Sequence, residues 1–311
     1  MTTAVPVPRW AAEADAHTLE WCTRHGLLSG PDPAERFRLA RFGTLAARTH
    51  PEASQESLPV LADWFAWAFV LDDHLDTGAH VPGQAGTPGV RRTSRLLAEF
   101  AAIVEGHAAV HGHAPVRLQP MTRALDDLWR RTSATMTAAV RHRTVRHLRE
   151  YLDALAMESG QRRRGRIPTL PEYVALRRVT GGVREDLDFA DHLAGRSLPD
   201  GLFEHPWHLD LLAAAGDVVN WTNDLASWRK EQACGEVHNL VLVLAHHTGR
   251  PPEEAAALVR NRIAERRDRF EGLTGHPPHP LLARRATALR QWADGFQAWL
   301  ADTDRYRAPA G

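Results

Sequence analysis

The 311-residue sequence lacks several features that mark common classes of protein. Its two cysteines, Cys22 and Cys234, show no paired spacing, so neither a disulfide framework nor a zinc site is expected. The 38 basic and 38 acidic side chains cancel, whereas a general nucleic-acid binder would carry an excess of Lys and Arg. We therefore expect no nucleic-acid partner.

Long apolar runs are also missing. The longest, such as LVLVLA from Leu240, fall far short of the ~20 residues that a membrane-spanning helix needs. The N-terminal MTTAVPVPRW lacks the charged segment and apolar core of a secretory signal. These absences predict a cytoplasmic protein without membrane insertion. There is no P-loop, CxxC pair or HExxH motif either, so nucleotide, redox and zinc-protease chemistry has no support.

Helical periodicity dominates what is present, and alternating strand patterns are nearly absent. Pro and Gly separate the segments, as in SGPDP from Ser29 and TGHPPHP from Thr274. No break is long or polar enough to be an interdomain linker. The pattern predicts a single all-α domain over residues 1–311 with about ten helices, residues 1–8 and 308–311 being flexible. The expected helical segments are 34–49, 56–77, 92–112, 117–159, 170–194, 208–231, 236–248, 252–273 and 280–304.

The segment FAWAFVLDDHLDTG, which starts at Phe65, continues an apolar helix face with carboxylates. At about 100° per residue, Phe65, Phe69, Asp72 and Asp76 fall on one stripe, with Asp73 to the side. Buried carboxylates without partners are costly, so a cation should meet them. A solvated acidic cluster at a helix end is the alternative, although acidic groups near a C-terminus oppose the helix dipole. A hard divalent cation fits Asp72 and Asp76 better.

A second set of oxygen donors lies in NWTNDLASWRKEQ, from Asn220. Asn223, Ser227 and Glu231 are spaced i, i+4 and i+8, which places them within an arc of about 80° on one helix. Amide, hydroxyl and carboxylate oxygens together suit Mg²⁺. Lys230 adjoins Glu231 and could reach a phosphate oxygen. A solvated helix face explains this motif equally well by itself, but two such motifs in one helical chain predict a shared metal site.

At this point the sequence resembles the bacterial class I terpene synthases, the terpene cyclases. The matching segments are DDHLD from Asp72, RRVTGG from Arg177, NDLASWRKE from Asn223 and WLADTDRY from Trp299. The resemblance extends over residues 40–307 and implies the class I terpenoid-synthase helical bundle around a central active-site cavity. It further implies three Mg²⁺ ions and an isoprenoid diphosphate substrate. Farnesyl diphosphate, giving a sesquiterpene, is the first candidate, and geranyl and geranylgeranyl diphosphate are the alternatives. The family often forms homodimers, and the sequence leaves the oligomeric state open.

The resemblance also implies a role for each matching residue. The metal ligands would be Asp72 and Asp76 for two ions and Asn223, Ser227 and Glu231 for the third. The donors to the diphosphate would be Arg177, Lys230, Arg305 and Tyr306. Asp73 would order a neighbouring arginine, because it points away from the other two aspartates.

The family's diphosphate sensor is an arginine, and Arg177 and Arg178 are both candidates. The family places a linker residue three positions after the sensor and a small effector four positions after it. Arg177 then gives Thr180 and Gly181, whereas Arg178 gives Gly181 and Gly182. We prefer Arg177, because Thr can relay a hydrogen bond and Gly cannot. The two glycines would break the helix and turn a backbone carbonyl toward the substrate, or they form a plain hinge.

Aromatic residues form two stripes beside these motifs. Phe69 and Phe65 lie one and two turns from the aspartates, and Trp292, Phe296 and Trp299 lead to the C-terminal Arg-Tyr pair. Aromatic faces stabilise a desolvated cation by roughly 0.5–2 kcal/mol each. Such stripes are core packing in most proteins, but next to two metal motifs they predict the lining of a carbocation cavity.

Two other interpretations share some of these features. Chain-elongating prenyltransferases and head-to-head condensing synthases normally carry two Asp-rich motifs, whereas the second motif here is of the Asn-Ser-Glu type. A non-enzymatic helical scaffold would leave the inward carboxylates unexplained. The two motifs therefore favour a cyclase.

Overall fold

The computed structural model describes residues 10–28, 32–77, 88–106 and 119–306. These residues form helices and no strand, which confirms the all-α prediction. No helix among them combines the length and apolar character of a membrane span. The predicted flexible ends, 1–8 and 308–311, lie outside the described residues. The helices are α1 (Ala11–His25), α2 (Pro33–Ala40), α3 (Phe42–Thr49), α4 (Ser57–Thr77), α5 (Pro88–Val104), α6 (Gln119–Ser133), α7 (Ala138–Arg163), α8 (Leu170–Thr180), α9 (Val183–Leu193), α10 (Asp200–Phe203), α11 (Pro206–Ala233), α12 (Leu240–Thr248), α13 (Pro252–Thr274) and α14 (Pro280–Asp302).

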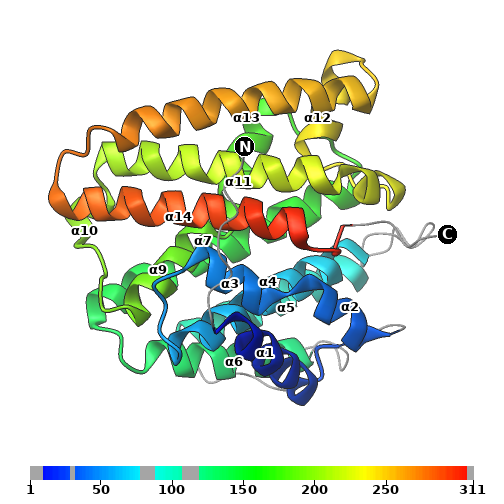
Figure 1. Ribbon diagram of the computed structural model, residues 1–311. Coiled ribbons are helices and arrows are strands. Elements are labelled where there is room, and N and C mark those ends of the chain that lie inside the picture. The colour runs from blue at the N-terminus through cyan, green and yellow to red at the C-terminus, as the bar shows by residue number, and fades with distance from the viewer. Residues whose placement is uncertain (1–9, 29–31, 78–87, 107–118, 307–311) are drawn as a thin grey trace.

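Seven helices form a closed ring of contacts. In Figure 1, α13, α11 and α14 lie side by side, and α11 contacts both of the others. From α14 the contacts pass to α3 and α4, then to α9, α7 and α8, and α8 returns to α11. The ring brings α4, with the first acidic motif, and α11, with the second, to the same interior.

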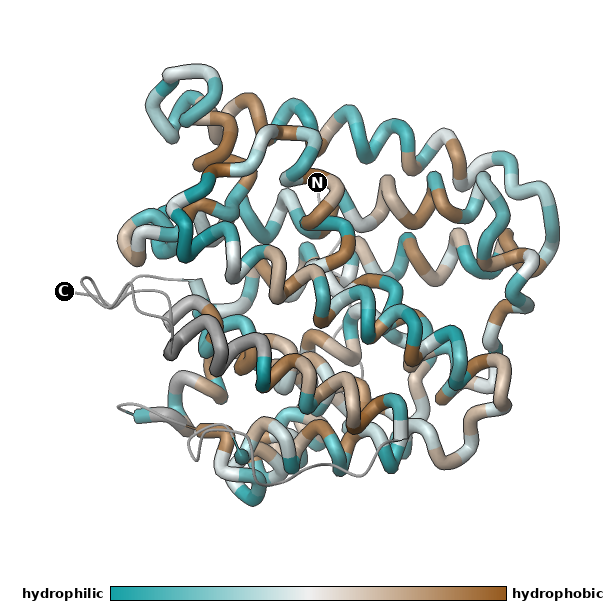
Figure 2. The backbone as a smooth tube through the Cα atoms, turned by 180° about the vertical axis from the view of Figure 1, so that it is seen from behind, coloured by the Kyte–Doolittle hydropathy of each residue, from teal (hydrophilic) through white to brown (hydrophobic). Residues whose placement is uncertain are grey.

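Amphipathic helices bury a main apolar core and a smaller second cluster around α12. Figure 2 shows hydrophobic and hydrophilic residues interspersed along the helices, as expected when one face of each turns inward. The main cluster of buried apolar residues runs from Ala11 in α1 to Trp299 in α14. Two of the buried tryptophans satisfy their indole N–H groups across helices: Trp21 donates to Asp127 over 2.8 Å and Trp64 to Thr132 over 2.9 Å.

The close approach of α3 and α14 depends on a glycine. A Cβ at Gly295 would lie 2.0 Å from the carbonyl oxygen of Arg48 and 2.7 Å from the amide nitrogen of Thr49. Arg48 then fastens the two helices, because its Nη1 donates to the carbonyl of Ala298 over 2.6 Å and its Nη2 to Asp302 over 2.5 Å. Backbone atoms cannot move aside as a flexible side chain can.

We expect Gly295→Ala to lower the free energy of unfolding by about 3 kcal/mol or more, because the added methyl group overpacks a backbone contact. Gly272→Ala in α13 is the matched control. Nothing lies within 4 Å of its added Cβ, so the better helix propensity of Ala should stabilise the protein slightly. Urea unfolding of both variants measures the difference, and equal stabilities would contradict this view of the α3–α14 contact.

Candidate active site

A pocket lies inside the ring of helices, lined from α4, α7, α8, α9, α11 and α14. The space free of protein atoms, including the open end, is about 990 Å³. Most of the wall is aromatic or aliphatic. Asp72, Arg177 and Asn223 form what we call the polar end. The aromatic wall consists of Trp64, Phe65, Trp67, Phe69, Tyr151, Phe189, Trp292 and Phe296.

The first acidic motif reaches this polar end from α4. Asp72 is exposed to the pocket. The surrounding protein nevertheless excludes much of the bulk water from its carboxyl group. Burial, with the neighbouring charge of Asp73, raises the pKa of Asp72 to about 6. Asp73 points aside and accepts from Arg305 Nη2 at 3.0 Å, as expected of a carboxylate that orders an arginine. Asp76 lies on α4, but its side chain is outside the described part of the chain.

The second motif lies along α11. Asn223 Oδ1 accepts from Arg177 Nη2 at 3.1 Å, and one turn further Ser227 is buried. Another turn on, Glu231 Oε2 accepts from Asn239 Nδ2 at 2.9 Å, and the same amide nitrogen lies 3.5 Å from Ser227 Oγ. Burial, with the charge of Asp224, raises the pKa of Glu231 to about 7. The carboxylate therefore lies where a positive charge would stabilise it.

The donor chemistry of these residues suits a hard divalent cation. Carboxylate, amide and hydroxyl oxygens are available from α4 and α11, and none of them is a soft sulfur ligand. The described residues include no group of three His, Cys, Asp or Glu side chains close enough to hold a metal alone. Metal binding would therefore use the mixed donor set, with oxygen atoms of a ligand completing the coordination.

Contacts across the polar end join the two motifs. Lys230 on α11 lies 3.6 Å from Asp73 on α4, measured from Nζ to Oδ1. Arg305 lies over the ring of Phe69 at 4.7 Å. Tyr306 accepts a hydrogen bond from Asn223 Nδ2 at 2.8 Å. Lys230, Arg305 and Tyr306, predicted from separate segments as donors to the diphosphate, thus all contact residues of α4 or α11 near the two motifs.

The structure distinguishes the two candidate sensor arginines. Arg177 lines the pocket, and its Nε donates to Asp224 over 3.1 Å. Arg178 turns away and makes a bidentate pair with buried Asp217, at 2.8 and 2.7 Å. Arg266 pairs with the same Asp217 carboxylate at 2.8 Å. The geometry therefore agrees with Arg177 as the residue facing a ligand.

The helix breaks after Arg177, where the glycine pair predicts it. α8 ends at Thr180, and α9 begins after Gly182, which has a φ of +68° that favours glycine. Thr180 Oγ1 is buried beside the pocket with no hydrogen-bond partner among the described residues. A Cβ at Gly181 would lie only 2.3 Å from Oδ1 of Asn220, so this glycine gives the Asn220 side chain its room.

Four of the five predicted cavity aromatics line the pocket: Phe65, Phe69, Trp292 and Phe296. The prediction for Trp299 is wrong. Its side chain is fully buried and donates from Nε1 to the carbonyl of Ala40 at 2.8 Å. It packs behind Phe69 and Phe296, with ring centroids 5.8 and 5.4 Å away. Trp299 therefore supports the wall from outside.

Sequence reasoning missed several polar residues of the site. Asp224 receives hydrogen bonds from Tyr173, Arg177 and the backbone of Leu240, and Asn239 holds Glu231. Glu185 and Asp186 of α9 line the pocket far along the chain from either metal motif. Only the position of Asp224 next to Asn223 could have indicated from the sequence that Asp224 belongs to the site. Nothing in the sequence pattern around Glu185 separates it from surface acids.

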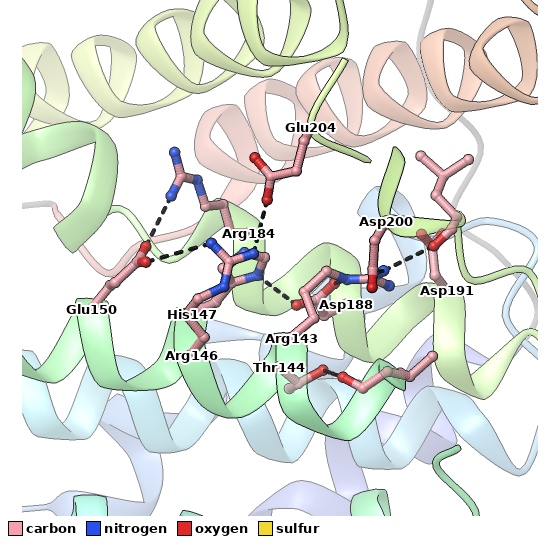
Figure 3. Close-up of polar contacts among 12 residues, drawn as sticks. Arg143, Thr144, Arg146, His147, Glu150, Arg184, Asp188, Asp191, Asp200 and Glu204 are labelled. Carbon is pink, nitrogen blue, oxygen red and sulfur yellow. Dashed lines mark hydrogen bonds and ion pairs between the residues drawn. The ribbon is translucent and has the colours of Figure 1, made fainter. Parts of the chain in front are cut away.

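A polar network holds α9 against α7 behind these pocket residues (Figure 3). Buried Asp188 accepts from Arg143 Nε at 3.2 Å and lies 2.7 Å from His147 Nδ1. Arg143 also donates to the carbonyl of Leu198 and to Asp200. With α9 fixed against α7 in this way, its pocket-lining residues are held in place.

The buried carboxyl of Glu185 predicts a pH-dependent stability. Burial, with the nearby charge of Asp188, raises its pKa from 4.5 to about 8. An acid whose pKa is higher in the folded state binds more protons there, so the free energy of unfolding falls as pH rises from 4.5 to 8. Glu185→Gln removes this loss. We expect its stability relative to wild type to grow by about 2–4 kcal/mol between these pH values.

Urea unfolding at pH 4.5, 6 and 8 measures this effect for both proteins. Asp153→Asn, which removes an exposed carboxylate from α7, is the control and should leave the pH profile unchanged. Parallel profiles for wild type and Glu185→Gln would show that the carboxyl is not buried as described.

Comparisons with known proteins agree with this site. The model of terpene synthase family 2, C-terminal metal binding, matches residues 63–269. The (-)-delta-cadinene synthase of Streptomyces clavuligerus is 33% identical, over 96% of this chain and 91% of that protein. The (+)-T-muurolol synthase of Roseiflexus castenholzii, named as cyclising (2E,6E)-farnesyl diphosphate, is 31% identical over 92% of this chain and 84% of that protein.

A solved structure shows the same fold. The linalool/nerolidol synthase of Streptomyces clavuligerus superposes with a TM-score of 0.82 at 25% identity, covering 96% of this chain and all of the other. The family model covers more than half of the chain and includes both motif helices from Asp63 onward. The chain therefore belongs to the bacterial class I terpene synthases, which are lyases acting on isoprenoid diphosphates.

Proposed function

We propose that this protein is a sesquiterpene cyclase that ionises farnesyl diphosphate with Mg²⁺ and releases diphosphate. One observation supports this most: Asp72, Arg177 and Asn223 share one pocket with an aromatic wall. A polar end able to hold a metal diphosphate and an apolar chamber able to hold a hydrocarbon cation are the two parts that the reaction needs. The names of its relatives favour a C15 substrate over C10 or C20.

The metal ligands we propose are Asp72 and Asp76 from α4 and Asn223, Ser227 and Glu231 from α11, for three Mg²⁺ ions. When bound, the ions would neutralise the departing diphosphate. A divalent cation 4 Å from a unit negative charge contributes about 8 kcal/mol at an effective dielectric of 20. Arg305, Tyr306 and Lys230 would donate to diphosphate oxygens, a task for which the planar Arg fork is well suited.

Arg177 would detect the diphosphate, with Thr180 as linker and Gly181 as effector. Its present hydrogen bonds to Asp224 and Asn223 place the guanidinium beside a proposed metal ligand. The hydroxyl of Thr180 has no hydrogen-bond partner among the described residues, so it could donate a hydrogen bond toward the substrate. The helix break after Thr180 places backbone groups on the pocket wall, where a carbonyl dipole could assist ionisation.

The packing also supports one functional domain, because the main apolar cluster includes residues of both α1 and α14, and α11 contributes to this cluster and to the second one. A homodimer remains a proposal that size-exclusion chromatography with light scattering would test.

Gas chromatography with mass spectrometry tests the function directly. The protein is incubated with Mg²⁺ and, separately, farnesyl, geranyl and geranylgeranyl diphosphate, while released diphosphate is measured. We expect the highest kcat/KM and a cyclic C15 product with farnesyl diphosphate. A preference for geranyl diphosphate would favour the C10 alternative, for which the name of the linalool/nerolidol synthase is a precedent. If none of the three substrates is turned over, the proposed enzymatic function is refuted.

A further inference from the structure

Two cavities approach each other at the wall of the active site. The second cavity lies between the α3–α4 connection, the C-terminal part of α9 with the following turn, and the first half of α14. Its space free of protein atoms, with its opening, is about 2030 Å³, and polar side chains such as Ser54, Ser57 and Gln291 line it. Water can occupy a cavity of this size and polarity.

A histidine–aspartate pair connects the two cavities. Asp186 lines the active-site pocket, and His50 lines the second cavity. His50 Nε2 lies 3.1 Å from both carboxylate oxygens of Asp186. The imidazole also stacks on Phe65 at 6.2 Å, so it packs directly against the pocket wall. Both side chains are about nine-tenths buried, with 10% and 11% of their surfaces exposed.

The carboxylate of Asp186 is held in place from the pocket side as well. Trp292, whose ring lines the pocket, donates from Nε1 to Asp186 Oδ2 at 2.7 Å. With the His50 ring proton on Nε2, these hydrogen bonds stabilise a negative charge in a mostly apolar wall. They also occupy lone pairs that could otherwise attack a carbocation and form an ester. A group so arranged can attract a cation and accept a proton from it.

We propose that Asp186 is the base that ends the reaction and that His50 holds its carboxylate in place. The proposal rests on the proposed cyclase function. A C–H bond next to the cationic carbon breaks, its electron pair forms the C=C bond of the product, and the proton moves to a carboxylate oxygen of Asp186. The His50 Nε2–H and Trp292 Nε1–H groups donate to the carboxylate during this transfer, and the acid returns its proton to water when the product leaves the pocket.

The neighbouring Glu185 does not fit this role. It lines the same pocket, but burial holds its pKa at about 8, so at neutral pH it is mostly protonated and cannot accept a proton. Two adjacent carboxyl groups thus have environments that separate their functions, and only the one bonded to His50 and Trp292 is available as a base.

The test compares Asp186→Asn, Asp186→Glu, Glu185→Gln and Asp153→Asn with wild type, using farnesyl diphosphate and Mg²⁺. Diphosphate release and product composition are both measured. We expect Asp186→Asn to release diphosphate within about fivefold of wild type, while the share of the main wild-type hydrocarbon falls at least about tenfold in favour of other olefins or alcohols. Asp186→Glu should recover part of that product, Glu185→Gln should change its share less than Asp186→Asn does, and Asp153→Asn should keep it.

The same main product in the same share from Asp186→Asn would overturn the proposal, as would a product change in Glu185→Gln alone. Should Asp186→Asn not fold, Asp186→Glu decides, because a base displaced by one methylene must change the ratio of olefin isomers. Wild-type diphosphate release tests the proposed function separately. His50→Leu, which removes the donor to Asp186, tests the positioning role: we expect a lower share of the main hydrocarbon with diphosphate release little changed, and an unchanged share would exclude that role.

Discussion

Asn223→Ala is expected to lower turnover by about 10²–10³-fold while preserving the helical circular dichroism. The amide is the point where three elements meet, because it accepts from Arg177, donates to Tyr306 and belongs to the oxygen donor set of α11. Its loss removes a proposed metal ligand and frees both partners. Asn223→Asp keeps an oxygen ligand but loses the donor to Tyr306, so it should retain more activity, with a changed dependence on Mg²⁺ concentration.

Thr222→Ala is the matched control for this prediction. Thr222 precedes Asn223 on the same helix, but its hydroxyl donates to the carbonyl of Val218 within α11. We expect near-normal kcat/KM for this variant in assays over a range of Mg²⁺ concentrations. Near-normal activity of Asn223→Ala as well would show that α11 does not hold a metal needed for the reaction.

The second large effect concerns the adjacent arginines. Arg177→Lys is expected to lower kcat/KM by at least about 10²-fold, because a single ammonium cannot reproduce the guanidinium contacts to Asp224 and Asn223 and also reach a diphosphate. Arg178→Lys should change kcat/KM less than about threefold. Asp217, the partner of Arg178, keeps its ion pair with Arg266 in that variant.

Steady-state kinetics and thermal unfolding of both variants separate function from stability. Similar melting temperatures with very different kcat/KM values are the expected result. A larger loss of activity in Arg178→Lys than in Arg177→Lys would reverse the assignment of the sensor, and with it the roles of Thr180 and Gly181.

The sequence predicted the motif helices well because their apolar and oxygen-bearing side chains recur at helical spacing. The expected segments 56–77 and 208–231 lie close to α4 and α11, which run from Ser57 to Thr77 and from Pro206 to Ala233. Glycine predicted the interruption between α8 and α9, because a positive φ suits it. The expected helix 34–49, by contrast, breaks at Arg41, which has a φ of +54° that its residue type does not indicate.

Other sequence-based predictions fail where tertiary contacts determine the position of a helix or the direction of a side chain. Helix α1 was not among the expected segments, although its packing on α3 holds it in place. The segment 117–159 contains two helices, with α7 starting only after Thr137 caps it. Trp299 follows the same helical spacing as Phe296, but its indole donates to Ala40 at the end of α2 and lies in the core. The His50–Asp186 pair joins residues 136 positions apart, and no local pattern predicts such a contact.

The central claim is that α4 and α11 hold metal ions between them at the polar end of the pocket. A crystal structure grown with Mn²⁺ and inorganic diphosphate tests it, because anomalous scattering locates Mn²⁺ directly. We predict anomalous peaks within coordination distance of Asp72 and of Asn223, Ser227 and Glu231, with the diphosphate contacting Arg177 and Arg305. A structure with diphosphate bound elsewhere, or with no peak beside either helix, would contradict the account.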